Sequence, residues 1–116
     1  MRSNTTIWLF NFEESQDEIN GTRTKIALLV TKVQAEKSPV GTQSYWDASS
    51  NHIQLAYTIQ MIERAYKLQK YVYFRDKGVG RVFEINNVGK GESEQFIKLY
   101  VKNTHEDLEE MIENVI

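Results

Sequence analysis

The sequence contains no cysteine and a single proline among its 116 residues. The lack of cysteine excludes disulfides, thiolate zinc sites and cysteine nucleophiles. Hydrophobic residues make up 41% of the chain and charged residues 26%, which is the composition of a globular protein and not of a disordered one. A chain of this length fits one domain, residues 1–116, built around one core.

Long apolar runs are also lacking, because no stretch approaches the ~18 residues that a membrane-spanning helix needs. The N-terminal segment MRSNTTIWLFNFEESQ has a short apolar stretch without a small-residue cleavage site after it, so we do not expect a signal peptide. These observations predict a cytoplasmic protein that does not associate with a membrane.

The formal net charge of −2 is too small to indicate a class of partner, but the charges are unevenly distributed. Residues 63–81 contain six basic and two acidic residues. Residues 13–18 contain four acidic residues and no basic ones, and residues 104–116 contain five acidic residues and neither lysine nor arginine. A basic middle segment is therefore flanked by two acidic segments.

The first half of the chain begins with a predicted strand over residues 5–12 that has large side chains on both faces. Such a strand lies centrally in a sheet or is buried against a partner. Residues 22–37 are ambiguous: their apolar positions fit a helical face, but they also alternate and are rich in β-branched residues, which favours a strand. We favour a strand that forms a hairpin with the first one.

Residues 51–69 have the strongest helical pattern in the sequence. Leu55, Ile59, Ile62 and Tyr66 recur at the spacing of one helix face, and Ser49 or Ser50 can cap the start. A hairpin over residues 71–87 and an alternating strand over residues 95–102 follow. A last helix is expected from Thr104, which forms a capping-box pattern with Asp107.

Together these elements predict an α+β fold, with a mixed or antiparallel sheet of about five strands and two helices. The expected order is β-β-α-β-β-β-α, in which the second element is ambiguous between strand and helix.

Catalytic and cofactor-binding motifs are not evident. His52 and His105 each lie at the start of a predicted helix, where their polar neighbours suit capping better than a catalytic triad. The Gly-Lys pair in VGKGES lacks the spacing and the Ser or Thr of a phosphate-binding loop. We therefore expect no enzyme, no cofactor and no metal ion.

The segment YKLQKYVYFRDKGVGRVF, residues 66–83, combines aromatic and basic residues around a glycine-containing turn. Tyrosines on one strand face could stack bases while cations contact phosphates. The simpler interpretation is an ordinary hairpin with a solvated face, because lysine on a strand also discourages edge pairing. The candidate nucleic-acid-binding residues, within the basic hairpin 64–81, are Lys67, Lys70, Tyr71, Tyr73, Arg75, Lys77 and Arg81.

Our leading hypothesis is a small non-enzymatic regulatory or inhibitory module that binds another protein, of the kind found among bacterial or phage accessory proteins. Aromatic residues are enriched at interfaces, and five of them crowd the first half of the chain. The candidate interface residues are Trp8, Phe10, Phe12, Tyr45 and Trp46. A homodimer formed through the first strand is expected, since that strand needs cover on both faces. The alternatives are the nucleic-acid-binding module and an enzyme of unfamiliar type.

Overall fold

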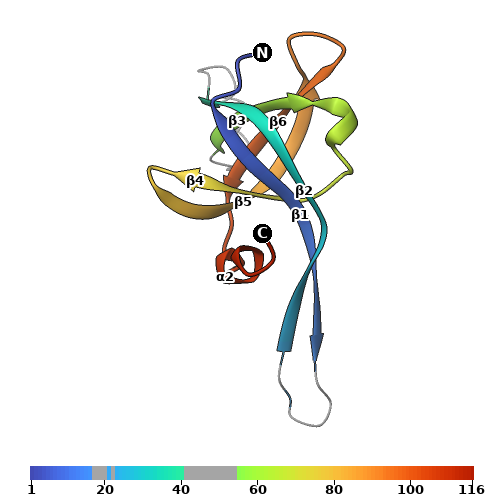
Figure 1. Cartoon of the computed structure of the whole chain (residues 1–116), viewed down its shortest axis with the longest axis vertical. Coiled ribbons are helices and arrows are strands. Elements are labelled where there is room, and N and C mark those ends of the chain that lie inside the picture. Colours follow the sequence, from blue (N-terminus) through green and yellow to red (C-terminus); the bar gives the residue numbers. More distant parts are fainter. Residues whose placement is uncertain (17–20, 22, 41–54) are drawn as a thin grey trace.

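The polypeptide folds around a barrel of antiparallel strands. The computed structural model describes residues 1–16, 21, 23–40 and 55–116. Within these residues it contains six strands, a 3₁₀ turn and one short α-helix (Figure 1). In chain order the elements are β1 (Thr5–Gln16), β2 (Arg23–Pro39), β3 (Leu55–Ile62), η1 (Glu63–Ala65), β4 (Tyr71–Asp76), β5 (Val79–Lys90), β6 (Phe96–Asn103) and α2 (Glu109–Glu113).

The strands follow one another around the closed barrel in the order β1-β2-β3-β6-β5-β4. Two antiparallel three-stranded units, β1–β3 and β4–β6, are joined by the pairs β1–β4 and β3–β6. Closure of a sheet on itself leaves few strand edges free to pair with other chains. A strand edge that remains unpaired in such a fold is therefore a candidate site for pairing with another chain.

The barrel interior holds the main hydrophobic core. Alternate residues along each strand point inward, as strand geometry requires. Phe74 and Phe83 stack within it, with ring centroids 4.9 Å apart. The buried members of this core are Ile7, Leu9, Ala35, Ile59, Met61, Val72, Phe74, Phe83, Ile97, Leu99 and Val101.

A second, smaller core lies on the outer face of the barrel, beneath α2. Phe10, Tyr73 and Val82 project outward there and are covered by Leu108 and Ile112 of the C-terminal segment. This arrangement explains why β1 carries large side chains on both faces. One face fills the barrel, and the other is covered by the chain's own C-terminal helix.

The predicted α+β fold is wrong, since the part of the chain that the structure describes contains six strands and a single short α-helix. The helix predicted over residues 51–69 is the main error. Residues 55–62 form β3, in which Tyr57, Ile59 and Met61 alternate toward the barrel interior. Residues 63–65 form η1, while Ser49, Ser50 and His52 lie outside the described residues.

The other elements agree more closely with their predictions. Residues 23–39 form a strand that pairs antiparallel with β1, as we favoured. The hairpin of β4 and β5 and the strand β6 are confirmed. The last helix is shorter than expected and begins at Glu109. Thr104 lies in the turn before it, where its Oγ1 accepts a hydrogen bond from the backbone N–H of Glu106 (3.1 Å).

Candidate protein-binding surface

Strands β1 and β2 continue past the barrel as a two-stranded arm. β1 pairs with β2 along its whole length but with β4 only from Trp8 to Phe10. β2 pairs with β3 only from Glu36 to Pro39. Residues 11–16 and 23–28, which we call the arm, therefore project from the barrel, and the molecule measures 50 × 30 × 27 Å (Figure 1).

A β-bulge marks the point where the arm leaves the barrel. Leu9 is paired with Thr31 and Asn11 with Leu28, so Leu29 and Val30 together oppose the single residue Phe10. Leu29 adopts a left-handed conformation with φ of 53°. For a leucine this conformation costs about 1–2 kcal/mol. A bulge of this kind bends the strand and increases its local twist.

The side chain of Gln69 fixes the bulge to the loop before β4. Gln69 is 1% exposed, and its Nε2 donates hydrogen bonds to the carbonyl oxygen of Leu29 (2.9 Å) and to Thr31 Oγ1 (3.1 Å). Its Oε1 accepts from the backbone N–H of Lys67 (2.7 Å). The adjacent backbone N–H of Lys70 donates to Asn11 Oδ1 (2.7 Å), so both strands are held at the base of the arm.

Four aliphatic side chains are exposed on β2 around the bulge. Ile26 is 51% exposed, Leu29 53%, Leu28 39% and Val30 40%. We call these four residues the arm patch; Ile26 and Leu28 are in the arm, and Leu29 and Val30 are in the bulge at its base. Leu68, in the loop held by Gln69, is 78% exposed and also has a positive φ, of 61°. Concentrated exposed aliphatic surface of this kind is typical of a binding site.

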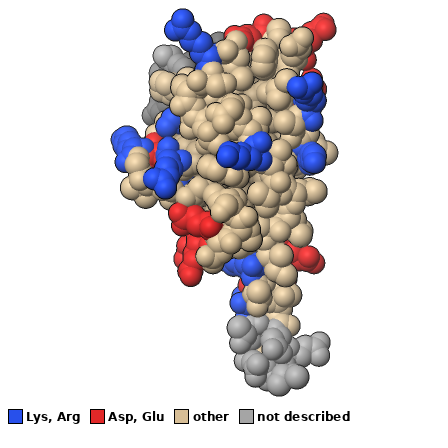
Figure 2. Space-filling model, in the orientation of Figure 1, with Lys and Arg blue, Asp and Glu red and all other residues tan. Residues whose placement is uncertain are grey.

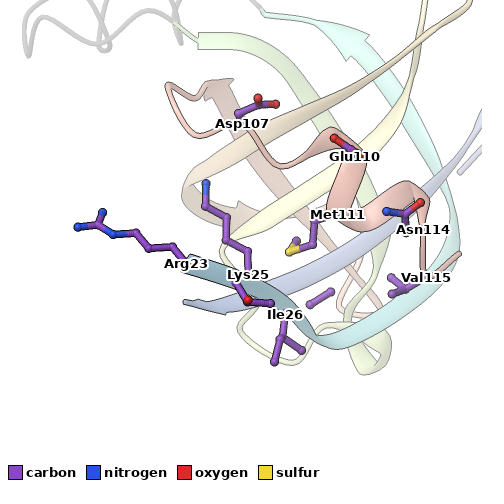
Figure 3. A pocket seen from close by; sticks show the side chains of 10 residues that line it. Arg23, Lys25, Ile26, Asp107, Glu110, Met111, Asn114 and Val115 are labelled. Atoms are coloured by element: carbon purple, nitrogen blue, oxygen red, sulfur yellow. The ribbon is translucent and has the colours of Figure 1, made fainter. Parts of the chain in front are cut away.

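A groove of about 560 Å³ runs between the arm and α2 (Figure 3). Five consecutive residues of β2 form one wall, and the C-terminal segment forms the other. The two walls carry opposite charges, with Arg23 and Lys25 on the strand and Asp107 and Glu110 on the C-terminal segment. The lining residues are Arg23, Thr24, Lys25, Ile26, Ala27, Asp107, Glu110, Met111, Asn114 and Val115.

The aromatic residues predicted for an interface are mostly packed within the chain. Phe10 is fully buried in the core beneath α2, and Trp8 and Phe12 are half-buried beside it. Trp8 packs on Tyr73 with ring centroids 5.7 Å apart. Tyr45 and Trp46 lie outside the described residues. The exposed aliphatic residues of β2 were missed, although the alternation in RTKIALLVTKV was a signal for them.

The two tyrosines of the basic hairpin also serve the core beneath α2. Tyr73 is 4% exposed, and its hydroxyl donates a hydrogen bond to Glu113 Oε2 (2.7 Å). Burial, followed by this bond to a carboxylate, raises the pKa of Tyr73 to about 12. Tyr71 is half-buried and stacks on Phe10 with centroids 5.8 Å apart, and burial raises the pKa of Tyr71 as well. Tyr73 is therefore buried beneath α2, and Tyr71 packs on Phe10 and Phe12 with part of its side chain exposed.

The cations of the same hairpin lie on the surface. On the face shown in Figure 2, acidic side chains lie among the basic ones, so the basic side chains do not form one continuous surface. Acidic residues of α2 also hold the hairpin, since Glu109 Oε1 accepts a hydrogen bond from the backbone N–H of Val82 (3.2 Å). The exposed cations are Arg64, Lys67, Lys70, Arg75, Lys77 and Arg81.

Comparison with protein-family models and with curated proteins finds no match for this chain. Across residues 1–16, 21, 23–40 and 55–116, no helix is both long and apolar enough to cross a membrane. The same described residues contain no cluster of three or more histidine and carboxylate side chains that could hold a metal ion. The arm patch and its groove are therefore the features from which we argue function.

Proposed function

We propose that this protein is a small non-enzymatic module that binds a partner protein, and that the arm is its binding element. The observation that carries this proposal is the arm patch on a projecting, internally braced ribbon. Aliphatic side chains exposed together lose their contact with water when a partner covers them, which supplies a favourable free energy of binding. A regulatory or inhibitory role, in a bacterial or phage setting, is part of the same hypothesis.

The bracing of the arm supports this function in a second way. The loop before β4 holds both strands at the base of the arm, because Gln69 Nε2 donates to the carbonyl oxygen of Leu29 and the backbone N–H of Lys70 donates to Asn11 Oδ1. A preorganised binding element loses less conformational entropy on association than a mobile one. The left-handed Leu29 fits the same picture, because backbone strain in folded proteins is concentrated at functional positions.

The alternative partners have less support from the geometry. Nucleic-acid binding by the 64–81 segment remains a prediction, in which exposed cations would act without the two tyrosines as stacking platforms. A homodimer through β1 also remains a prediction, but α2 already covers the outer face of that strand, so a second copy is not needed for this purpose.

A site-specific cross-linking experiment tests the arm. A photo-reactive phenylalanine analogue would replace Leu28 in one version of the protein and Val88 in another. These positions have matched exposures of 39% and 42%, but Val88 is on β5, away from the arm. After irradiation in host lysate, we expect a discrete protein adduct at position 28 and none at position 88.

A pair of matched variants extends the test. Ile26→Ser with Leu28→Ser should abolish capture of the same partner, whereas Val79→Ser with Val88→Ser should leave it unchanged. Urea midpoints would show that each variant is folded. Equal capture by both double variants would contradict the proposal.

A further inference from the structure

We infer that the outer edge of β2 in the arm accepts an extended segment of the partner as an added strand, and that acidic and apolar residues alternate in this segment. The inference rests on the proposed function, because it identifies the kind of segment that the arm binds. Three observations carry it: an unpaired strand edge, the shape of the groove along that edge, and the charge of β2.

The edge is the first observation. From Arg23 to Ala35, β2 is paired on one side by β1, and no other strand among the described residues pairs with it there. In an antiparallel ladder, successive residues direct their N–H and C=O groups to alternate sides. About half of the backbone groups of residues 23–28 therefore face the outer side, where none of the described strands pairs with them. Such an edge is the usual docking site for an extended peptide.

The groove is the second observation, because it runs along this edge and can admit a ligand. Its strand wall consists of the consecutive residues 23–27, and none of the described residues of β1 lines it. A pocket over the flat face of the ribbon would be lined by alternate residues of both strands. A pocket lined by consecutive residues of one strand instead lies along that strand's edge. Met111 and Val115 form an apolar surface on the opposite wall (Figure 3).

The charge of β2 indicates the chemistry of the added strand. Residues 23–35 contain three cations, Arg23, Lys25 and Lys32, and no acidic residue. Arg23 and Lys25 share one face of the strand, and Thr24 and Ile26 share the other. Carboxylates opposite the two cations and apolar residues opposite Ile26 would match both faces of β2, while Asp107 and Glu110 on the other wall repel such carboxylates and reduce the gain. Opposite charges directly across neighbouring strands are favourable, and like charges are not.

Arg23 and Lys25 already form ion pairs within the chain, but these pairs do not prevent either cation from binding a ligand. Arg23 lies 3.8 Å from a carboxylate oxygen of Glu14, and Lys25 lies 3.6 Å from one of Glu106. The acidic side chains are 38% and 47% exposed, and exposed pairs of this kind contribute little free energy. A carboxylate supplied by a bound strand can share or replace either contact at small cost.

Short synthetic peptides provide the test. One would alternate glutamate with valine, a second lysine with valine, and a third would repeat the first with N-methylated alternate residues that cannot form a ladder. We expect the glutamate peptide to bind about tenfold more tightly than the lysine peptide, the effect of two cross-strand charge pairs. The N-methylated peptide should bind at least as weakly as the lysine peptide.

Charge reversal in the protein gives the matched control. Arg23→Glu with Lys25→Glu should invert the preference between the glutamate and lysine peptides. Lys90→Glu with Lys98→Glu, on β5 and β6, should leave the preference unchanged. Amide exchange should slow at residues 23–28 when the glutamate peptide is bound, because added-strand hydrogen bonds protect these groups.

Equal binding of the three peptides, absence of binding, or protection elsewhere in the barrel would overturn the inference. Amide signals of residues 23–28 that change with protein concentration alone, together with dimers in sedimentation, would show a second copy of the chain on this edge and would also overturn it. If the cross-linking and capture experiments succeed while the peptides show no preference, only the added strand is refuted. If those experiments fail, the proposed function itself is refuted.

Discussion

Replacement of Gln69 by leucine tests whether its amide holds the arm to the barrel. The substitution keeps most of the side-chain volume but removes three hydrogen bonds, to the carbonyl oxygen of Leu29, to Thr31 Oγ1 and from the N–H of Lys67. A side-chain hydrogen bond contributes about 0.5–1.5 kcal/mol net, so removal of three would cost about 1.5–4.5 kcal/mol.

The expected loss lies toward the lower end of that range. The leucine side chain gains free energy from its burial at this position, and this gain offsets part of the loss of the three hydrogen bonds. We expect the free energy of unfolding to fall by about 2 kcal/mol. Equilibrium urea denaturation measures this directly, as a lower midpoint with an unchanged slope.

The chain offers a matched control in Gln34, an exposed glutamine on the same strand as Leu29. Its Oε1 accepts one hydrogen bond, from Thr6 Oγ1 (3.1 Å). Gln34→Leu should change the unfolding free energy by less than about 0.5 kcal/mol. Amide exchange in the arm should accelerate in Gln69→Leu and not in Gln34→Leu. Equal stability and equal exchange in the two variants would refute the role assigned to Gln69.

Three further predictions concern the two cores and one turn. Ile59→Ala should cost about 2–5 kcal/mol in urea denaturation, because this residue is fully buried in the barrel, and a neutral result would contradict its place there. The pKa of Tyr73 rises from 10 to about 12 on folding, so the unfolded chain loses the Tyr73 proton at a lower pH than the folded chain does. The free energy of unfolding should therefore fall as pH rises from 10 to 12. The Tyr73→Phe variant should lose less stability than the wild type over that pH range. Equal losses of stability in the two proteins would count against the raised pKa of Tyr73. Gly91→Ala should cost about 1–3 kcal/mol, because an added Cβ would lie 2.6 Å from the carbonyl group of Phe96; an unchanged urea midpoint would show that the turn can yield.

The strands of the barrel could be predicted where alternation was the only pattern that fitted. β6 alternates cleanly, and the β4–β5 hairpin has a glycine-containing turn between two apolar strands. In β3 the apolar residues fit two periods at once. Leu55, Ile59 and Ile62 suit a helix face, while Tyr57, Ile59 and Met61 suit a strand, and over so short a segment the two patterns cannot be separated locally. The pairing of β3 with β2 and β6 decides between them, and this pairing is a long-range property.

The candidate site was harder to predict for the same reason. The aromatic residues of β1 suggested an interface, but whether they are exposed depends on where the distant C-terminal helix packs. That helix contains few residues, and nothing in its sequence specifies β1 as its neighbour. The arm likewise depends on how far β1 pairs with β4 and how far β2 pairs with β3. Only the aliphatic alternation of residues 23–33 was visible locally, and it does not show which of these side chains remain exposed.

The two leucines beside Gln69 are the strongest argument that this region is kept for contact with another molecule. Leu29 and Leu68 both have positive φ angles, where glycine or asparagine would fold with less strain. Both side chains are more than half exposed, so the core gains little from them. Leucine at these positions therefore costs stability through the backbone, and the isolated chain gains little burial from these side chains in return. A partner that covered these side chains would supply the burial that the isolated chain lacks, and Gln69 fixes the two segments where such a partner on the arm would meet them.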